Sequence, residues 1–221
     1  MEPTHIVTRF DKDLSEIETL LVEMSDKVAD QIVKSAEALK AGDDKLAKKV
    51  SKADQDVNKL EEKIDEKAIR LIALRQPMAE DLRSAITTLK VSSSLERMGD
   101  YAKTLSYRTR EVDDFSAMKS VLRSISEMSE KIAAMLNLVM EGYVNRDLEK
   151  AEAARLADEE INDKTDALFR ELLTYMMENP RNIEPCTHLL LISKNLERSG
   201  DQVTNIAEQV HYLVTGEIWE Q

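Results

Sequence analysis

The chain has 221 residues, of which 42% are hydrophobic and 33% are charged, and its formal net charge is −12. This acidity argues against a nucleic-acid backbone or an anionic membrane surface as the main partner, because both would repel the chain. Only 5 glycines and 4 prolines occur, and aromatic residues make up 4% of the chain. Such sparse turn residues are atypical of sheet proteins, so the composition predicts an almost entirely helical fold.

The start of the chain lacks the basic and apolar regions of a signal peptide. No uninterrupted apolar run approaches the roughly 18 residues that a membrane-spanning helix needs. The single cysteine, Cys186, cannot form an internal disulfide. We therefore expect a cytoplasmic protein without a membrane-inserted segment.

The first two predicted helices carry apolar residues at alternating steps of three and four, which is typical of helices that bury one face. The first helix ends at Gly42, and Asp43 caps the second, which extends to the break at Pro77. The apolar positions of the first helix are Leu14, Ile17, Leu21, Met24, Val28 and Ile32. Those of the second are Leu46, Val50, Ala53, Val57, Leu60, Ile64, Ala68 and Leu71.

Four further helices complete the predicted plan. A third extends from about residue 79 to 111, and residues 113–116 open a fourth. Asp147 caps a fifth helix, and a sixth begins after the turn at residues 179–185. Each half is thus predicted to be a three-helix bundle, with residues 1–112 in the first and 113–221 in the second.

A six-residue word occurs twice, as LERMGD at residues 95–100 and as LERSGD at residues 196–201. Each copy places two carboxylates four residues apart, on one face of a predicted helix. It also includes a mid-helix glycine, which costs about 1 kcal/mol relative to alanine and indicates that something offsets this cost. The repeat identifies a tandem duplication and predicts paired metal sites, with Glu96 and Asp100 in one and Glu197 and Asp201 in the other.

Spacing alone does not carry this prediction. Acid pairs four residues apart also occur at Asp26 and Asp30, at Glu61 and Asp65, and at Glu159 and Asp163. A solvated charged face is the simplest explanation for any one such pair. Recurrence of the whole word is what distinguishes the two predicted sites.

The apolar seam of the sixth helix places Glu197 and Asp201 roughly 140–180° away from its centre. Glu208 continues this acidic stripe, and Asn205 borders it. Tyr107 stands where Glu208 does in the second half. We therefore expect fewer carboxylates and weaker metal binding in the first half.

A second match, offset by 104 residues, lies on the neighbouring predicted helices and pairs Asp54 and Asn58 with Asp158 and Asn162. These four residues are candidate additional ligands, or hydrogen-bond partners of ligands. Hydrogen bonding along a helix surface is the alternative explanation.

Three arginines, Arg70, Arg75 and Arg83, flank Pro77 in an otherwise acidic chain. Together they predict a basic lip that docks an acidic patch of a partner protein. Solvated helix ends are the alternative.

Four stretches carry a resemblance to a known family: the second repeated word, residues 205–208 (NIAE), residues 212–217 (YLVTGE) and residues 75–83 (RQPMAEDLR). In these stretches the chain resembles the PhoU family, the accessory proteins of bacterial phosphate-specific transport. The resemblance implies an all-α fold with two tandem three-helix bundles related by pseudo-twofold symmetry. It implies a repressor of the phosphate-starvation response that links the ATPase subunit of the transporter to the sensor histidine kinase. We also expect a homodimer. The resemblance further implies a divalent or ferric metal at the acid-x-x-x-Asp motif, and oxygen ligands favour iron, manganese or magnesium over zinc.

Two alternatives remain beside a metal-binding adaptor. A ferritin-like carboxylate-bridged di-metal site needs two Glu-x-x-His pairs; Glu208 and His211 supply one, but the repeat does not supply its counterpart, because Arg110 stands at the position that matches His211. No glycine-rich phosphate loop and no repeated Ser/His/Asp set occurs, so we expect a protein that is not an enzyme. A purely structural helical adaptor would leave the acidic stripe without a ligand.

Overall fold

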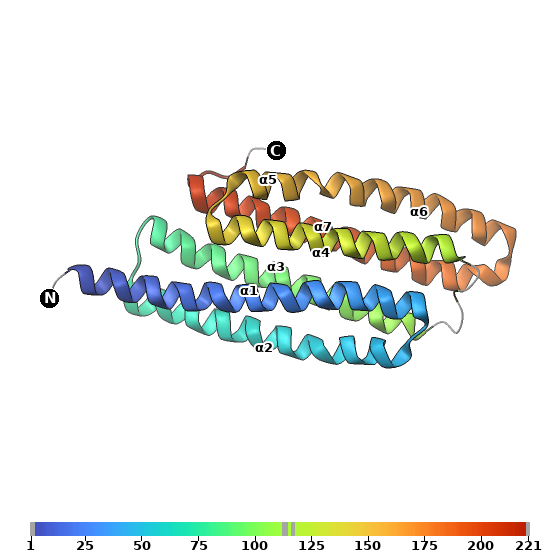
Figure 1. The fold of residues 1–221 in the computed structure, drawn as a ribbon, viewed down its shortest axis with the longest axis horizontal. Helices are drawn as coiled ribbons and strands as arrows, with labels where there is room; N and C mark the ends of the chain where they lie inside the picture. Colours follow the sequence, from blue (N-terminus) through green and yellow to red (C-terminus); the bar gives the residue numbers. More distant parts are fainter. Residues whose placement is uncertain (1–2, 112–114, 116–117, 220–221) are drawn as a thin grey trace.

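The computed structural model describes residues 3–111, 115 and 118–219, and for residues 3–8 only the backbone. Three long helices form the first half, α1 (Pro3–Ala41), α2 (Asp44–Arg75) and α3 (Glu80–Thr109) (Figure 1). The second half contains α4 (Lys119–Asn145), α5 (Leu148–Leu156), α6 (Asp158–Glu178) and α7 (Ile183–Thr215), with the short helix η2 (Pro180–Asn182) before α7. Together α5 and α6 occupy the place of one long helix. The all-α prediction of two three-helix bundles is confirmed.

Local signals set the helix ends. The Asp43 and Asp147 side chains each accept hydrogen bonds from two backbone N–H groups of the following turn, at 3.0 to 3.2 Å. Each cap follows a residue in the left-handed region, Gly42 at φ 62° and Arg146 at φ 56°. The predicted caps of the second and fifth helices are therefore confirmed, and the two turns are equivalent in both halves.

Two boundaries differ from the predictions. The last helix begins at Ile183, so Pro185 lies in its first turn and not before it. Proline is tolerated there because the first N–H groups of a helix have no partner within it. The predicted fifth helix is interrupted at Ala157, directly before Asp158. The predicted opening of the fourth helix falls mainly on residues 112–114 and 116–117, which lie outside the described residues.

Corresponding helices of the two halves pack against each other. α1 lies along α4 and α3 lies along α7, so two of the three helices in each half meet their own counterparts, as expected for helices next to a pseudo-twofold axis (Figure 1). The predicted apolar seams of α3 and α7 are buried, and one continuous hydrophobic core extends through both halves. The hydroxyl groups of Thr88 on α3 and Tyr143 on α4 lie 3.0 Å apart inside this core.

The outer helices determine what the acidic words contact. α2 packs on α3, and α6 packs on α7. The acidic face of each repeated word therefore borders a neighbouring helix of its own half. Within the described residues, no helix has the length and the apolar character needed to cross a membrane.

Candidate metal centres

The glycine of each repeated word lies against a buried aspartate of the neighbouring helix. A Cβ added at Gly99 would meet Asp54 Oδ1 at 3.4 Å, and one added at Gly200 would collide with Asp158 Oδ1. Asp54 on α2 is 1% exposed and Asp158 on α6 is 8% exposed. The missing side chain makes room for a buried carboxylate in each half. This close approach explains why a glycine occupies the middle of two long helices.

Five carboxylates of α2 and α3 form what we call the first cluster: Asp54, Glu61, Asp65, Glu96 and Asp100. Burial, followed by the charges of Glu96, Asp65 and Asp100, raises the pKa of Glu61 to about 7. Burial and the adjacent Asp100 also raise the pKa of Glu96. The two helices thus hold an excess of negative charge in a partly desolvated position.

Lys103 on α3 lies between two of these carboxylates. Its Nζ is 2.8 Å from Asp54 Oδ2 and 3.2 Å from Asp100 Oδ1. The hydrogen bond with Asp54 is the main cause that raises the pKa of Lys103. The other oxygen, Asp54 Oδ1, has no hydrogen-bond partner in the described part of the chain.

Three carboxylates form the second cluster: Asp158 of α6 with Glu197 and Asp201 of α7. Burial, followed by the charges of Asp201 and Glu197, raises the pKa of Asp158 to about 6. Burial and Glu197 likewise raise the pKa of Asp201. Asn162 donates a hydrogen bond to Asp158 Oδ2 at 3.3 Å, whereas Asp158 Oδ1 has no partner among the described residues.

The other predicted site residues have different environments. Asn58 is half-buried, and its Oδ1 finds no hydrogen-bond partner in the described ranges. Asn205 is exposed on α7. Glu208 is half-buried further along α7, where its charge helps to raise the pKa of Arg155 on α5. Glu208 is not among the charges that raise the pKa of Asp158 or Asp201, and its predicted role as a ligand stays a prediction.

Three expectations change with the structure. Asp54 and Asp158 are buried, and hydrogen bonding along the helix describes only Asp158, which accepts from Asn162, whereas Asp54 pairs with Lys103 of the neighbouring helix. Glu61 and Asp65 were missed, because their spacing is one of several in the chain and only the packing of α2 on α3 distinguishes them. They also give the first cluster more carboxylates than the second, opposite to the expected count, and the weaker metal binding expected of the first half stays a prediction.

The donor set suits a hard cation, because carboxylate oxygens are the preferred ligands of magnesium and manganese. An unpartnered oxygen on a buried aspartate in each half also fits a cation. Within the described residues, however, no three Asp, Glu, His or Cys side chains lie close enough together to hold one ion. Binding would therefore require the outer carboxylates to turn toward the buried one.

Comparison with known proteins identifies the family. The model of the PhoU domain matches residues 21–109 and 125–210. The chain belongs to the PhoU family. Phosphate-specific transport system accessory protein PhoU homologues of Caulobacter vibrioides and Rhizobium meliloti are each 42% identical to it, over 96% and 98% of this chain and 93% and 91% of theirs. The accessory protein PhoU of Escherichia coli is 33% identical over 96% of this chain and 88% of its own.

Solved PhoU structures have the same fold. The crystal structure of PhoU from Pseudomonas aeruginosa superimposes with a TM-score of 0.89 at 31% identity, and covers 94% of this chain and 100% of that one. The phosphate transport system regulatory protein PhoU from Streptococcus pneumoniae gives a TM-score of 0.88 at 28% identity, covering 96% and 100%. These relatives are named as accessory or regulatory proteins, and none of these names describes an enzyme.

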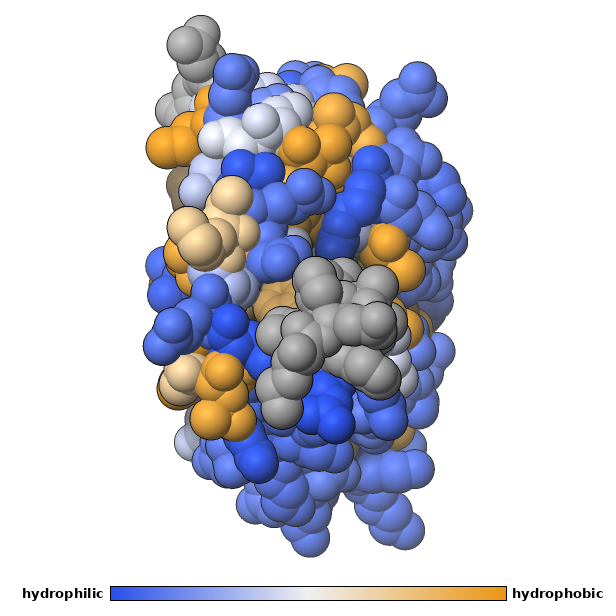
Figure 2. Space-filling model, turned by 90° about the vertical axis from the view of Figure 1, so that its left-hand side faces the viewer, coloured by the Kyte–Doolittle hydropathy of each residue, from blue (hydrophilic) through white to orange (hydrophobic). Residues whose placement is uncertain are grey.

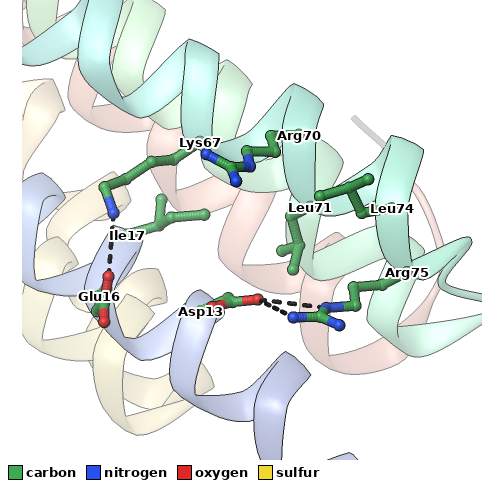
Figure 3. Close-up of a pocket in the computed structure, with 8 residues that line it drawn as sticks. All are labelled: Asp13, Glu16, Ile17, Lys67, Arg70, Leu71, Leu74 and Arg75. Carbon is green, nitrogen blue, oxygen red and sulfur yellow. Dashed lines mark hydrogen bonds and ion pairs between the residues drawn. The ribbon is translucent and has the colours of Figure 1, made fainter. Parts of the chain in front are cut away.

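In this PhoU family member, Arg70 and Arg75 line a pocket of about 290 Å³ between α1 and α2 (Figure 3). Two ion pairs cross it, from Lys67 to Glu16 and from Arg75 to Asp13, each at 3.0 Å. Arg70 takes part in neither pair and is exposed. Among the described residues that line the pocket, three are cationic and two are carboxylates.

Arg83 lies away from this pocket. Its guanidinium packs on Gly216 at the end of α7, where an added Cβ would be 2.9 Å from Nη1. The last carbonyl groups of a helix carry partial negative charge, which favours a cation there. The predicted basic lip is therefore divided, because Arg70 and Arg75 share the pocket between α1 and α2 and Arg83 lies at the end of α7.

His211 does not join the clusters. Its ring centroid lies 4.6 Å from that of Trp219, and its Nδ1 is 3.2 Å from the carbonyl oxygen of Glu217. The histidine that pairs with Glu208 in sequence thus contacts the C-terminal segment. This position gives no support to the di-metal alternative.

Proposed function

We propose that this chain is a cytoplasmic, non-enzymatic regulator of phosphate uptake that restrains the phosphate-starvation response. The supporting observation is its 42% identity, over nearly the whole chain, to proteins named as phosphate-specific transport accessory proteins. In this proposal it acts as a homodimer and links the ATPase subunit of the transporter to the sensor histidine kinase. The net charge of −12 on this chain favours basic surfaces on these partners. Local basic positions of the chain, such as Arg70, would instead contact acidic surfaces.

Deletion of the protein should leave phosphate-starvation genes expressed in phosphate-rich medium. A relay that restrains the kinase is lost in such cells, so the response no longer follows phosphate supply. Reporter expression in rich and poor medium, with and without a plasmid copy of the gene, measures this effect. Normal repression in the deletion strain would contradict the proposal.

Metal binding is the second part of the proposal and concerns the second cluster. It is supported by the buried and unpartnered Asp158 Oδ1 beside Asp201 and Glu197. In this site Asp158, Glu197 and Asp201 would hold a divalent or ferric ion, which would neutralise three mutually repelling carboxylates.

Glu197→Gln combined with Asp201→Asn should abolish metal binding in the second half with little change in the melting temperature. Both side chains lie outside the apolar seam, and the double substitution removes like charges that repel each other. Mn²⁺ titration calorimetry and thermal unfolding without metal provide the two measurements. The matched variant, Glu96→Gln with Asp100→Asn, should have the smaller effect on total metal because Glu61 and Asp65 remain. A melting temperature that falls by more than about 4 °C would instead assign the second pair a structural role.

Arg70→Glu should weaken capture of the acidic partner surface, most strongly at low salt. Exposed rim charges act mainly on association rate and on salt dependence. Leu74 and Met78 are 64% and 80% exposed. The end of the molecule at which the chain passes from α2 to α3 has a mainly hydrophilic surface with separate apolar patches (Figure 2). Association kinetics with the purified kinase and ATPase at several salt concentrations test this expectation. Arg170→Glu on the exposed face of α6 is the control, and equal effects of the two reversals would reject the pocket as the docking surface.

A further inference from the structure

The two clusters differ at one pair of equivalent positions. The repeat aligns Lys103 of α3 with Thr204 of α7, and it aligns the buried Asp54 with the buried Asp158. In the first half a lysine ammonium therefore reaches the buried aspartate. In the second half the corresponding side chain is a short hydroxyl, and Thr204 Oγ1 has no hydrogen-bond partner among the described residues.

The position of Lys103 resembles that of a bound cation. Its Nζ contacts Asp54 at 2.8 Å and Asp100 at 3.2 Å, one carboxylate from each helix. Asp54 is 1% exposed, so its charge would be costly to bury without such a partner. An ammonium group and a metal ion cannot occupy the same space, and a retained ammonium also repels an ion nearby.

Within the described residues, the second half contains no equivalent pair. The only polar partner of the Asp158 carboxylate in the described structure is the neutral amide of Asn162 at 3.3 Å. Lys194 lies on α7 shortly before Glu197, and its Nζ pairs with Glu197 at 2.6 Å. That pair lies toward the surface, since the Lys194 side chain is 51% exposed. Among the residues that the structure describes, the buried Asp158 carboxylate thus has no cationic partner.

We propose that the Lys103 ammonium fills, in the first half, the cation position that stays open at Asp158 in the second half. A divalent cation then reaches the buried aspartate only in the second half. In the first half it is confined to the outer carboxylates Glu61, Asp65 and Glu96. The inference rests on the metal binding proposed above and adds that the two halves bind metal at different positions and with different affinities.

Reciprocal substitutions test the inference, with Mn²⁺ as the probe. Lys103→Thr should add one bound Mn²⁺ per chain, because it opens the position at Asp54. Thr204→Lys should weaken Mn²⁺ binding in the second half by about 10- to 100-fold, the range seen when groups around metal ligands change. The double variant should return to the wild-type total. Titration calorimetry, with electron paramagnetic resonance of free Mn²⁺, gives stoichiometry and affinity.

Further variants separate charge from fold. Lys103→Arg retains the cation and should not gain a Mn²⁺, whereas Lys103→Gln should behave like Lys103→Thr. Asp54→Asn placed on Lys103→Thr should remove the added ion. Circular dichroism tests whether each variant is folded. If Lys103→Thr does not fold, Lys103→Gln takes its place in the Mn²⁺ titrations.

Two results would overturn the inference. If the wild type binds Mn²⁺ but neither reciprocal substitution changes stoichiometry or affinity, the inference fails and the proposed metal binding stands. If neither the wild type nor any variant binds Mn²⁺, the proposed metal binding fails and the inference fails with it. A gain with Lys103→Thr that persists after Asp54→Asn would also count against it.

Discussion

Gly200→Ala is expected to lower the free energy of unfolding by about 1 to 3 kcal/mol, the usual cost of overpacking a buried position. The added Cβ collides with Asp158 Oδ1, and Asp158 is buried and has little room to turn. Gly99→Ala should be nearly neutral, because its nearest neighbours lie at 3.3 to 3.4 Å and alanine improves helix propensity by about 1 kcal/mol. Urea denaturation of both variants measures the difference, provided that the m-value is unchanged.

A second substitution tests the cause. Asp158→Ala in the Gly200→Ala background should recover much of the lost stability, because it removes the atom with which the Cβ collides. The same Asp158→Ala change in the Gly99→Ala background should give no such specific recovery. If Gly200→Ala is as stable as the wild type, the glycine is not required for the approach of Asp158.

The metal-free protein should become less stable as pH rises from about 5 to about 8. Burial and neighbouring charges raise the pKa of Asp158 from 3.8 to about 6 and that of Glu61 from 4.5 to about 7. A carboxyl group with a higher pKa in the folded state holds its proton more tightly there, so its deprotonation favours unfolding across this window. We expect a loss of about 1 to 3 kcal/mol between pH 5 and pH 8, after allowing for partial solvation of these groups.

Asp158→Asn should remove part of this pH dependence. The variant should exceed the wild type in stability at pH 8 and approach it near pH 4, where the wild-type aspartate is protonated. Thermal unfolding in chelator across this range measures the effect, with roughly 2 to 4 °C expected per kcal/mol. Asp166→Asn on the exposed face of α6 controls for the loss of one charge. Parallel pH profiles of Asp158→Asn and the wild type would show that the buried carboxylate does not cause the dependence.

The sequence by itself determined the helices and their duplication. The caps at Asp43 and Asp147 depend on hydrogen bonds within one turn, and an apolar seam depends on the 3.6-residue repeat of one helix. Both signals are local, so they can be read along the chain. The repeated word gave the relation between the halves and the two acid pairs of α3 and α7, because an internal copy is visible without any knowledge of packing.

Only the tertiary structure decided which side chains of α2 and α6 face those acids. The periodicity of a helix fixes which residues share a face, but not the depth at which that face meets a neighbouring helix. Asp54 and Asp158 are buried because a glycine on the opposite helix allows close approach, and Glu61 joins the first cluster because α2 packs along α3. The contact of Lys103 with Asp54 likewise joins residues 49 positions apart. Separate packing partners also divide Arg75 from Arg83, although both lie close to Pro77 in the chain.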